Sequence, residues 1–136
     1  MNIGKKSRST IEGLLVLAKK PFAATLQQRD IVKAARVPAD FLAKIFQKLN
    51  RVNLVISSGG AVRAYALAHR PNVIKMRDGF VAIDGNDVFE RCIFWSDRCA
   101  DLSPCPMHFE WEKMRQAIVA LMQRTTLAEL ARKSRQ

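Results

Sequence analysis

The chain has 136 residues, 49% of them hydrophobic, which suffices for one domain with a hydrophobic core but leaves little room for two. It has no uncharged apolar run of the roughly 18 residues that a membrane span needs, and residues 1–6 lack the apolar core of a secretory signal, so we expect a soluble, cytoplasmic protein without a membrane partner. The net charge of +11 is uneven, because residues 1–70 carry 13 Lys/Arg and three Asp/Glu whereas residues 71–136 carry 10 and nine, which favours a polyanion as the partner of the N-terminal half.

Two short helices are predicted first. Residues 8–20 place apolar side chains at helical spacing and stop at Pro21. Residues 26–35 follow a pattern typical of a capping box, with Thr25 as N-cap and Gln28 three positions on. After a short break at residues 36–37, Pro38 suits the first turn of another helix, where its missing N–H needs no partner.

The third predicted helix covers residues 38–52 and is amphipathic. Its inner stripe is expected to consist of Phe41, Leu42, Ile45, Phe46, Leu49 and Val52. Its outer face is expected to carry Asp40, Lys44, Gln47, Lys48 and Arg51. Two helices joined by a turn of about three residues, the second with a basic outer face, are typical of a helix-turn-helix, although any small helical bundle contains helix pairs.

A β-hairpin is predicted directly after this helix pair. Residues 54–57 and 62–67 read as strands, and residues 58–61 read as the turn between them. A hairpin in this place is the wing of a winged helix, so we interpret residues 1–70 as a winged helix-turn-helix that binds double-stranded DNA. The candidate DNA-binding residues are Arg8, Gln28, Ala39, Asp40, Lys44, Lys48, Arg51, Ser58 and Arg63.

Residues 71–136 are predicted to form a separate cysteine-loop and dimerisation region. We expect a short helix over residues 73–83, a turn at 84–86 and a loop over 91–106. A helix of about 18 residues then begins near Met107. It carries Met107, Trp111, Met114, Ile118 and Leu121 at alternating spacings of four and three. Such a heptad seam predicts a homodimer, which would read the two half-sites of a palindromic operator, or else packs on the chain's own core.

The three cysteines lie close together, in the spacing Cys92-x6-Cys99-x5-Cys105, and His108 follows three positions later. An odd number of cysteines argues against a disulfide framework. Three thiolates and one imidazole provide four ligands, which complete either an iron–sulfur or a zinc site, although structural zinc prefers closer pairs. From the spacing alone a cluster, zinc and unligated thiols remain open. No catalytic constellation and no phosphate-cradling glycine loop is visible, so we expect no enzyme.

At this point the sequence resembles the winged-helix iron–sulfur regulators typified by IscR, NsrR and RirA, over residues 1 to about 131. The resemblance rests on residues 6–18, 41–49 with 54–55, the cysteine loop, and the closing segment 125–130. It implies a homodimer, a recognition helix in the major groove and a wing at the minor groove. It also implies a cluster held by Cys92, Cys99 and Cys105, with His108 as fourth ligand to a [2Fe-2S] form, a [4Fe-4S] form being the other possibility.

Three positions depart from the family pattern. NsrR-like members take a carboxylate near position 8, where this chain has Arg8; Glu12 is a reserve candidate one turn on. The wing lacks the usual arginine before its glycines, and Arg63 is expected to take over at the minor groove. Ala43 stands where some members keep a glutamate that tunes base choice. The family predicts a repressor whose DNA affinity follows cluster state; a cluster-free thiol sensor or a zinc-containing regulator is the alternative.

Overall fold

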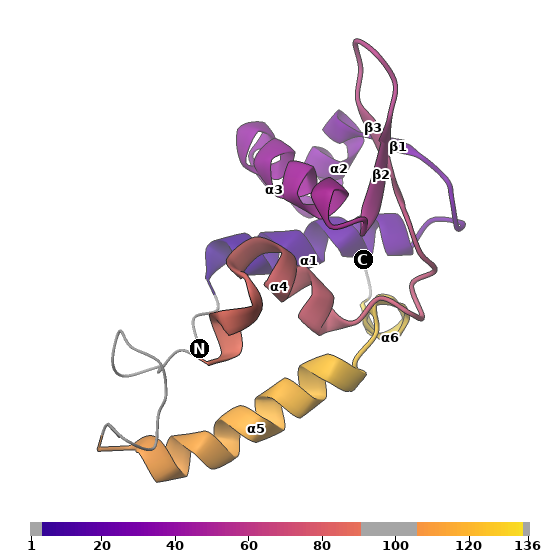
Figure 1. Ribbon diagram of the computed structural model, residues 1–136. Helices are drawn as coiled ribbons and strands as arrows, with labels where there is room; N and C mark the ends of the chain where they lie inside the picture. The colour runs from indigo at the N-terminus through magenta and orange to yellow at the C-terminus, as the bar shows by residue number, and fades with distance from the viewer. Residues whose placement is uncertain (1–3, 91–105, 135–136) are drawn as a thin grey trace.

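The computed structural model describes residues 4–90 and 106–134 and is mainly helical, with one small sheet (Figure 1). Its elements are α1 (Lys5–Ala18), β1 (Leu26–Gln27), α2 (Gln28–Ala35), α3 (Ala39–Arg51), β2 (Val55–Ser58), β3 (Ala64–Leu67), α4 (Met76–Asp84), the 3-10 helix η1 (Asn86–Phe89), α5 (His108–Arg124) and α6 (Leu127–Lys133). The predicted fold class, helical with a β-hairpin wing, is confirmed.

The helix-turn-helix forms where it was predicted. Pro38 is the N-cap of α3, and its carbonyl accepts a hydrogen bond from the backbone N–H of Leu42 at 2.9 Å, which closes the first helical turn. The inner stripe of α3 is buried at Leu42, Ile45, Phe46 and Leu49. Val52 was wrongly assigned to this stripe: it lies just beyond the last helical residue and is 49% exposed.

The sheet has three antiparallel strands in the order β1-β3-β2, one more than predicted. β1 pairs Leu26 with Tyr65 and Gln27 with Ala64 on β3. The helix predicted from residue 26 therefore starts at Gln28, and Gln27 rather than Thr25 is its N-cap, with no side-chain hydrogen bond. The predicted capping box is wrong because the backbone of residues 26–27 pairs with a distant strand instead.

Helix α1 lies at the centre of the fold and contacts α2, α3, α4 and α6. It begins and ends earlier than predicted, at Lys5 and Ala18. The main hydrophobic core unites residues from both sides of position 70, such as Leu14 of α1, Ile74 and Leu127, which are at most 1% exposed. Residues 1–70 and 71–136 thus share one core. That the first region binds DNA and the second binds a cluster and forms the dimer stays a prediction.

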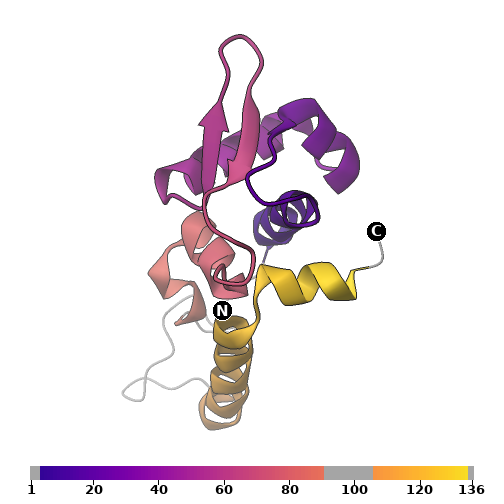
Figure 2. The ribbon, with the colours of Figure 1, turned by 90° about the vertical axis from the view of Figure 1, so that its right-hand side faces the viewer.

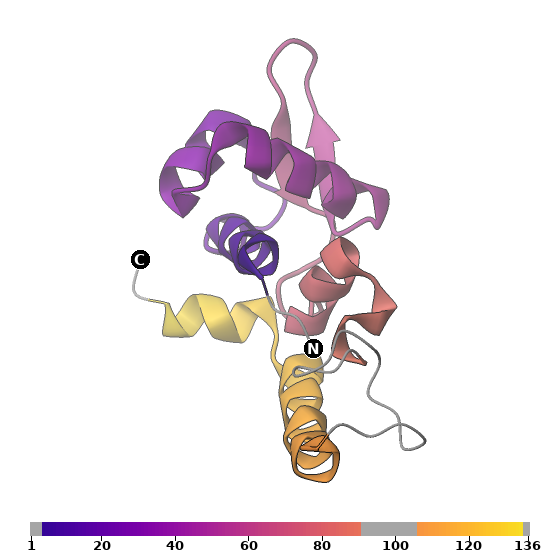
Figure 3. The same ribbon diagram turned by 90° about the vertical axis from the view of Figure 1, so that its left-hand side faces the viewer.

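The C-terminal elements form a second, smaller core on the opposite side of α1 from the wing. Phe80, Val88, Phe89, Trp111 and Met122 are buried there together with Ile11. Figures 1 and 3 show α5 at the end of the molecule opposite to α3 and the wing. Among the described helices, none is long and apolar enough to cross a membrane.

The last helix, α6, was not predicted. The hydroxyl of its N-cap, Thr126, accepts a hydrogen bond from the backbone N–H of Glu129 at 3.1 Å. The main-chain N–H of Leu127 also donates to the carbonyl of Ile74 at 2.9 Å. Figure 2 shows the chain turning sharply from α5 into α6, which runs back toward α1.

Candidate nucleic-acid interface

The exposed face of α3 carries the predicted basic residues together. Lys44 and Arg51 are exposed and Lys48 is half-buried, all on the side of the helix away from Leu42 and Phe46. This arrangement follows from the 3.6-residue helical period, because the apolar stripe turns inward and the intervening positions turn out. The helix therefore presents cations along one exposed side, as an element that enters a major groove must.

The start of α3 is also exposed. Ala39 and Asp40 form its first turn and both face solvent. Ala39 has a side chain small enough to let another molecule approach the backbone, and Asp40 is favourably placed beside the positive end of the helix dipole. Recognition helices contact base edges mainly through their N-terminal residues, so these two positions lie where predicted contacts require them.

The wing stands beside α3 at the same end of the molecule (Figure 1). Ser58 ends β2 opposite Ala64, and Arg63 directly precedes β3; both are exposed. The intervening turn needs a glycine at position 59, where φ is +93° and a Cβ atom would lie 2.3 Å from the carbonyl oxygen of Val62. Val62 is 56% exposed, so an apolar side chain faces outward in the wing turn.

Two hydrogen bonds fix the wing relative to the helix pair. The backbone N–H of Gln28, the first residue of α2, donates to the carbonyl of Arg63 at 3.1 Å. The side-chain amide of Asn50 on α3 donates to the hydroxyl of Ser57 on β2 at 3.4 Å. The first bond gives the predicted residue Gln28 a structural role. Asn50 could not be predicted from the sequence, because the bond depends on how β2 folds back against α3.

Arg8 lies on α1 and not on the helix-turn-helix or the wing. Its Nε donates to Oε1 of Glu12 at 3.2 Å, an exposed pair one helical turn apart. Arg8 lines a cleft between α1 and the turn after α2, together with cations that sequence reasoning did not select. These are Lys5, Lys19, Lys20 and Arg36.

Helix α5 is divided between a buried and an exposed apolar side. Of the predicted seam, Trp111 is 7% exposed and packs in the smaller core, whereas Met107, Met114 and Leu121 are 45%, 61% and 47% exposed. These three follow one another at seven-residue intervals. The predicted seam is therefore two stripes, one facing the chain's own core and one facing outward.

One ion pair on α5 changes a pKa. Nη2 of Arg115 donates to Oε1 of Glu112 at 2.6 Å, and its Nη1 donates to the carbonyl of Phe89 at 3.1 Å. The hydrogen bond from Arg115 lowers the pKa of Glu112 below its ordinary value. Arg115 thereby ties α5 to η1 with its charge compensated.

The predicted cluster ligands fall into two groups. Cys92, Cys99 and Cys105 lie outside the described residues. His108 is the first residue of α5, is 2% exposed, and packs edge-on against Phe109 with 5.0 Å between ring centres. Whether the imidazole and the thiols act together stays a prediction.

Comparison with known proteins accounts for nearly the whole chain. Residues 3–133 match the Rrf2 family, described as iron-dependent transcriptional regulators. A protein of Aquifex aeolicus classed with HTH-type transcriptional regulators is 27% identical over 103 residues, which cover 74% of this chain and 72% of that one. The fold is similar to CymR, the global cysteine regulator of B. subtilis, with a TM-score of 0.79 and 23% identity over 98% of both chains. It is also similar to IscR of T. potens, with a TM-score of 0.72 and 20% identity over 98% of this chain and 88% of that one.

Proposed function

We propose that this chain, which belongs to the Rrf2 family of transcriptional regulators, binds a palindromic DNA operator as a homodimer and represses transcription according to the state of an iron–sulfur cluster. The family makes it a DNA-binding regulator and not an enzyme. We further propose that the operator is palindromic, that the chain forms a homodimer and binds a cluster, that it represses rather than activates, and that it works in the cytoplasm.

The proposed mode of DNA binding is supported by one observation: the basic outer face of α3 lies beside the wing. Lys44, Lys48 and Arg51 would contact phosphates or base edges in the major groove. Ala39 and Asp40, at the N-terminal end of α3, would enter the groove first. The wing would approach the minor groove with Ser58 and Arg63 near its ends, and Gln28 would support it. Arg8 is proposed as a peripheral contact.

Salt dependence tests this mode. We expect the affinity for a labelled duplex, selected from a random pool by the wild-type chain, to fall linearly with salt on a double-logarithmic plot. Lys44→Ala should reduce the slope by about one, the loss of one phosphate contact. Lys113→Ala, which removes an exposed lysine of α5, is the matched control and should leave the slope unchanged. Equal slopes for Lys44→Ala and the wild type would contradict the assignment of α3.

The dimer is proposed through the outer stripe of α5. Met107, Met114 and Leu121 leave apolar surface exposed at the spacing of a coiled-coil seam. Two copies of α5 packed on these residues would hold two recognition helices at a fixed separation, as a palindrome requires. Met114→Glu should produce a monomer by analytical ultracentrifugation, with Lys113→Glu as the control on an adjacent exposed position.

The donor set fits an iron–sulfur cluster. Thiolates bind such clusters and imidazole can replace some of them, which suits Cys92, Cys99 and Cys105 with His108. His108 is buried at the start of α5, next to the cysteine segment in the sequence. Glu12 is the reserve ligand, from the partner's first helix, although Arg8 already binds its carboxylate. A bound cluster would supply the electron-transfer and degradation chemistry that senses iron, cluster supply, nitric oxide or oxidants.

The chain's own contribution is to transmit that state to DNA. The cysteine segment ends at α5, which packs on α4 and η1, and α4 packs on α1 and α3. A change of charge or order at residues 92–108 would bias the arrangement of α5, and hence the separation of the two recognition helices.

Spectroscopy with metal analysis tests the cluster. Protein purified without oxygen should absorb in the visible region and contain iron and acid-labile sulfide in the amounts expected for a [2Fe-2S] cluster. Cys92→Ala should lose the visible absorbance, the iron and the sulfide. Zinc without iron, or thiols whose redox state alone changes DNA affinity, would replace the cluster proposal with the zinc or thiol alternative while leaving the DNA-binding mode intact.

A further inference from the structure

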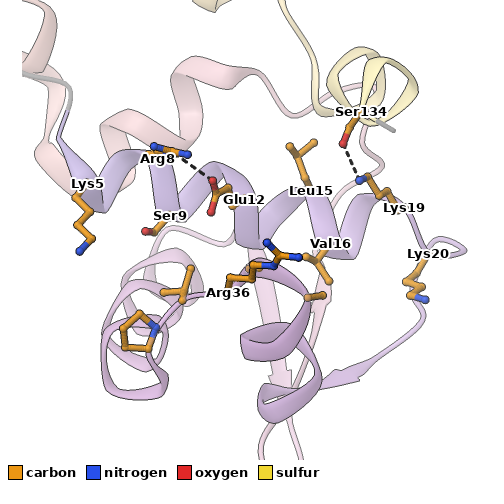
Figure 4. A pocket seen from close by; sticks show the side chains of 14 residues that line it. Lys5, Arg8, Ser9, Glu12, Leu15, Val16, Lys19, Lys20, Arg36 and Ser134 are labelled. Carbon is orange, nitrogen blue, oxygen red and sulfur yellow. Dashed lines mark hydrogen bonds and ion pairs between the residues drawn. The ribbon is translucent and has the colours of Figure 1, made fainter. Parts of the chain in front are cut away.

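A cleft of about 940 Å³ lies between α1, the turn after α2 and the C-terminal end of α6. It falls within the size range of small-molecule sites, about 300–1,000 Å³. Figure 4 shows its charged side chains arranged along α1, with Lys5 near one end, Lys20 near the other and Arg36 between them. Neither the α3 face nor the wing contributes to its lining.

The lining combines apolar surface with an excess of positive charge. Leu15, Val16, Ala35 and Val37 provide apolar walls. Five lining side chains are cationic (Lys5, Arg8, Lys19, Lys20 and Arg36), whereas Glu12 is the one carboxylate among the described lining residues.

Much of the cleft's positive charge is not neutralised by its acidic residue. Glu12 already pairs with Arg8 at 3.2 Å. Nζ of Lys19 donates to the hydroxyl of Ser134 at 2.7 Å, a bond that ties the end of α1 to the residue that follows α6. An anion entering the cleft would therefore gain charge-assisted hydrogen bonds beside apolar walls.

Arg36 sits in the cleft at a backbone position where arginine is unfavourable. It is the C-cap of α2, with φ 56° and ψ 44°, in the left-handed region that glycine adopts at helix ends without strain. Figure 4 shows its side chain reaching from the turn toward α1. The guanidinium is exposed and adds a cation to the lining of the cleft.

From these observations we infer that the cleft binds a small organic anion with an apolar body, such as a medium-chain carboxylate. The carboxylate would lie against Arg36 and the neighbouring lysines, and the apolar body against Leu15, Val16 and Val37. The excess of cations over carboxylates in the described lining selects an anion, the apolar walls select an amphipathic one, and the volume limits its size.

Such a ligand would act as an effector, an extension that rests on the proposed DNA-binding function. Residues 36–38 form the turn that joins α2 to α3, and the backbone of Pro38 caps α3. A molecule that bridges α1 and this turn would bias the position of α3 relative to α1. By linkage, DNA would change the ligand's affinity by the same factor.

Binding is tested first without DNA, on the full chain. The fluorescent anion 8-anilinonaphthalene-1-sulfonate is the probe, and octanoate and octanol are competitors of equal chain length. We expect octanoate to displace the probe and octanol not to do so. Arg36→Gly, which relieves the backbone and removes the guanidinium, should weaken octanoate competition by about tenfold or more, as loss of a charge-assisted bond implies. Arg124→Ala, which removes an exposed arginine of α5 outside the cleft, is the matched control and should compete like the wild type.

The outcomes separate this inference from the proposed function. Equal competition by octanol, or an unchanged affinity for octanoate in Arg36→Gly, overturns the site. If Arg36→Gly instead lowers the salt slope of DNA binding as Lys44→Ala does, with octanoate competition unchanged, the cleft cations are a DNA surface and the site is overturned. If octanoate competition depends on Arg36 but the chain binds no DNA, the site stands and the proposed function fails. Octanoate should shift DNA affinity in the wild type and not in Arg36→Gly; no shift in the wild type overturns the effector role.

Discussion

Gly13 lies where α1 packs against Phe46 and Leu42 of α3, and Gly13→Ala tests that packing. A Cβ atom there would lie 2.8 Å from Cε1 and 3.2 Å from Cζ of Phe46. Ordinary carbon–carbon contacts begin near about 3.5 Å, so the ring would have to move by about 0.7 Å. Phe46 is fully buried and packs edge-on against Tyr65 with 4.9 Å between ring centres, which leaves little room for that movement.

The magnitude follows from two opposing effects. Overpacking a closed core costs about 1–3 kcal/mol, whereas alanine is favoured over glycine inside a helix by about 1 kcal/mol. We expect Gly13→Ala to lower the free energy of unfolding by about 0–2 kcal/mol, measured by urea denaturation with an unchanged m-value. Gly60→Ala, where a Cβ would meet nothing within 4 Å, is the control and should not destabilise the protein.

The contact between Gly13 and Phe46 can be tested further by making Gly13→Ala in a variant with a smaller residue at position 46. In Phe46→Leu, which replaces the ring by a smaller side chain, Gly13→Ala should cost less than in the wild type, because the two residues are in contact. The account of this contact is refuted if Gly13→Ala stabilises the protein by the helical preference alone. It is equally refuted if the cost is the same in both backgrounds.

Three further predictions concern single contacts. Ser7→Ala removes the bond of 2.7 Å from the buried Ser7 hydroxyl to Oδ2 of Asp84, and chemical denaturation should show a loss of about 1 kcal/mol; no loss would mean that water replaces the bond. Thr126→Ala removes the N-cap of α6 and should lower the free energy of unfolding by about 1 kcal/mol in the same assay; an unchanged free energy would show that the cap does not stabilise the protein. Gly59→Ala strains the wing turn, so DNA affinity should fall while Gly60→Ala binds normally; equal affinities would exclude a role for the wing shape.

The helix-turn-helix was predictable because its signals are local. Pro38 and the apolar spacing of residues 42–49 specify α3 without reference to the rest of the chain, and the same spacing fixes which cations face outward. Lys44, Lys48 and Arg51 could therefore be placed on one face from the sequence. Val52 was misplaced because the period continues past the residue where the helix ends.

Features that depend on contacts between residues far apart in the sequence could not be predicted from local patterns. Leu26 and Gln27 look like the start of a helix, and they become a strand only because Tyr65 and Ala64 lie beside them. The end of α2 before Arg36 was predicted, but the left-handed conformation of Arg36 was not, because glycine is the residue that usually marks such a cap. The cleft was unpredictable for a related reason, since it brings together α1, residues 34–38 and Ser134. By contrast, α6 could have been found, because Thr126 followed by Glu129 has the capping-box pattern.

We propose that the basic winged unit holds duplex phosphates. The most direct test of this binding is the anisotropy of a labelled duplex titrated with the wild-type chain at a series of salt concentrations. We predict tight binding at low ionic strength and a steep, linear loss of affinity as salt rises, as expected when several lysines and arginines displace counterions. Failure to bind at low ionic strength, or an affinity indifferent to salt, would contradict the claim.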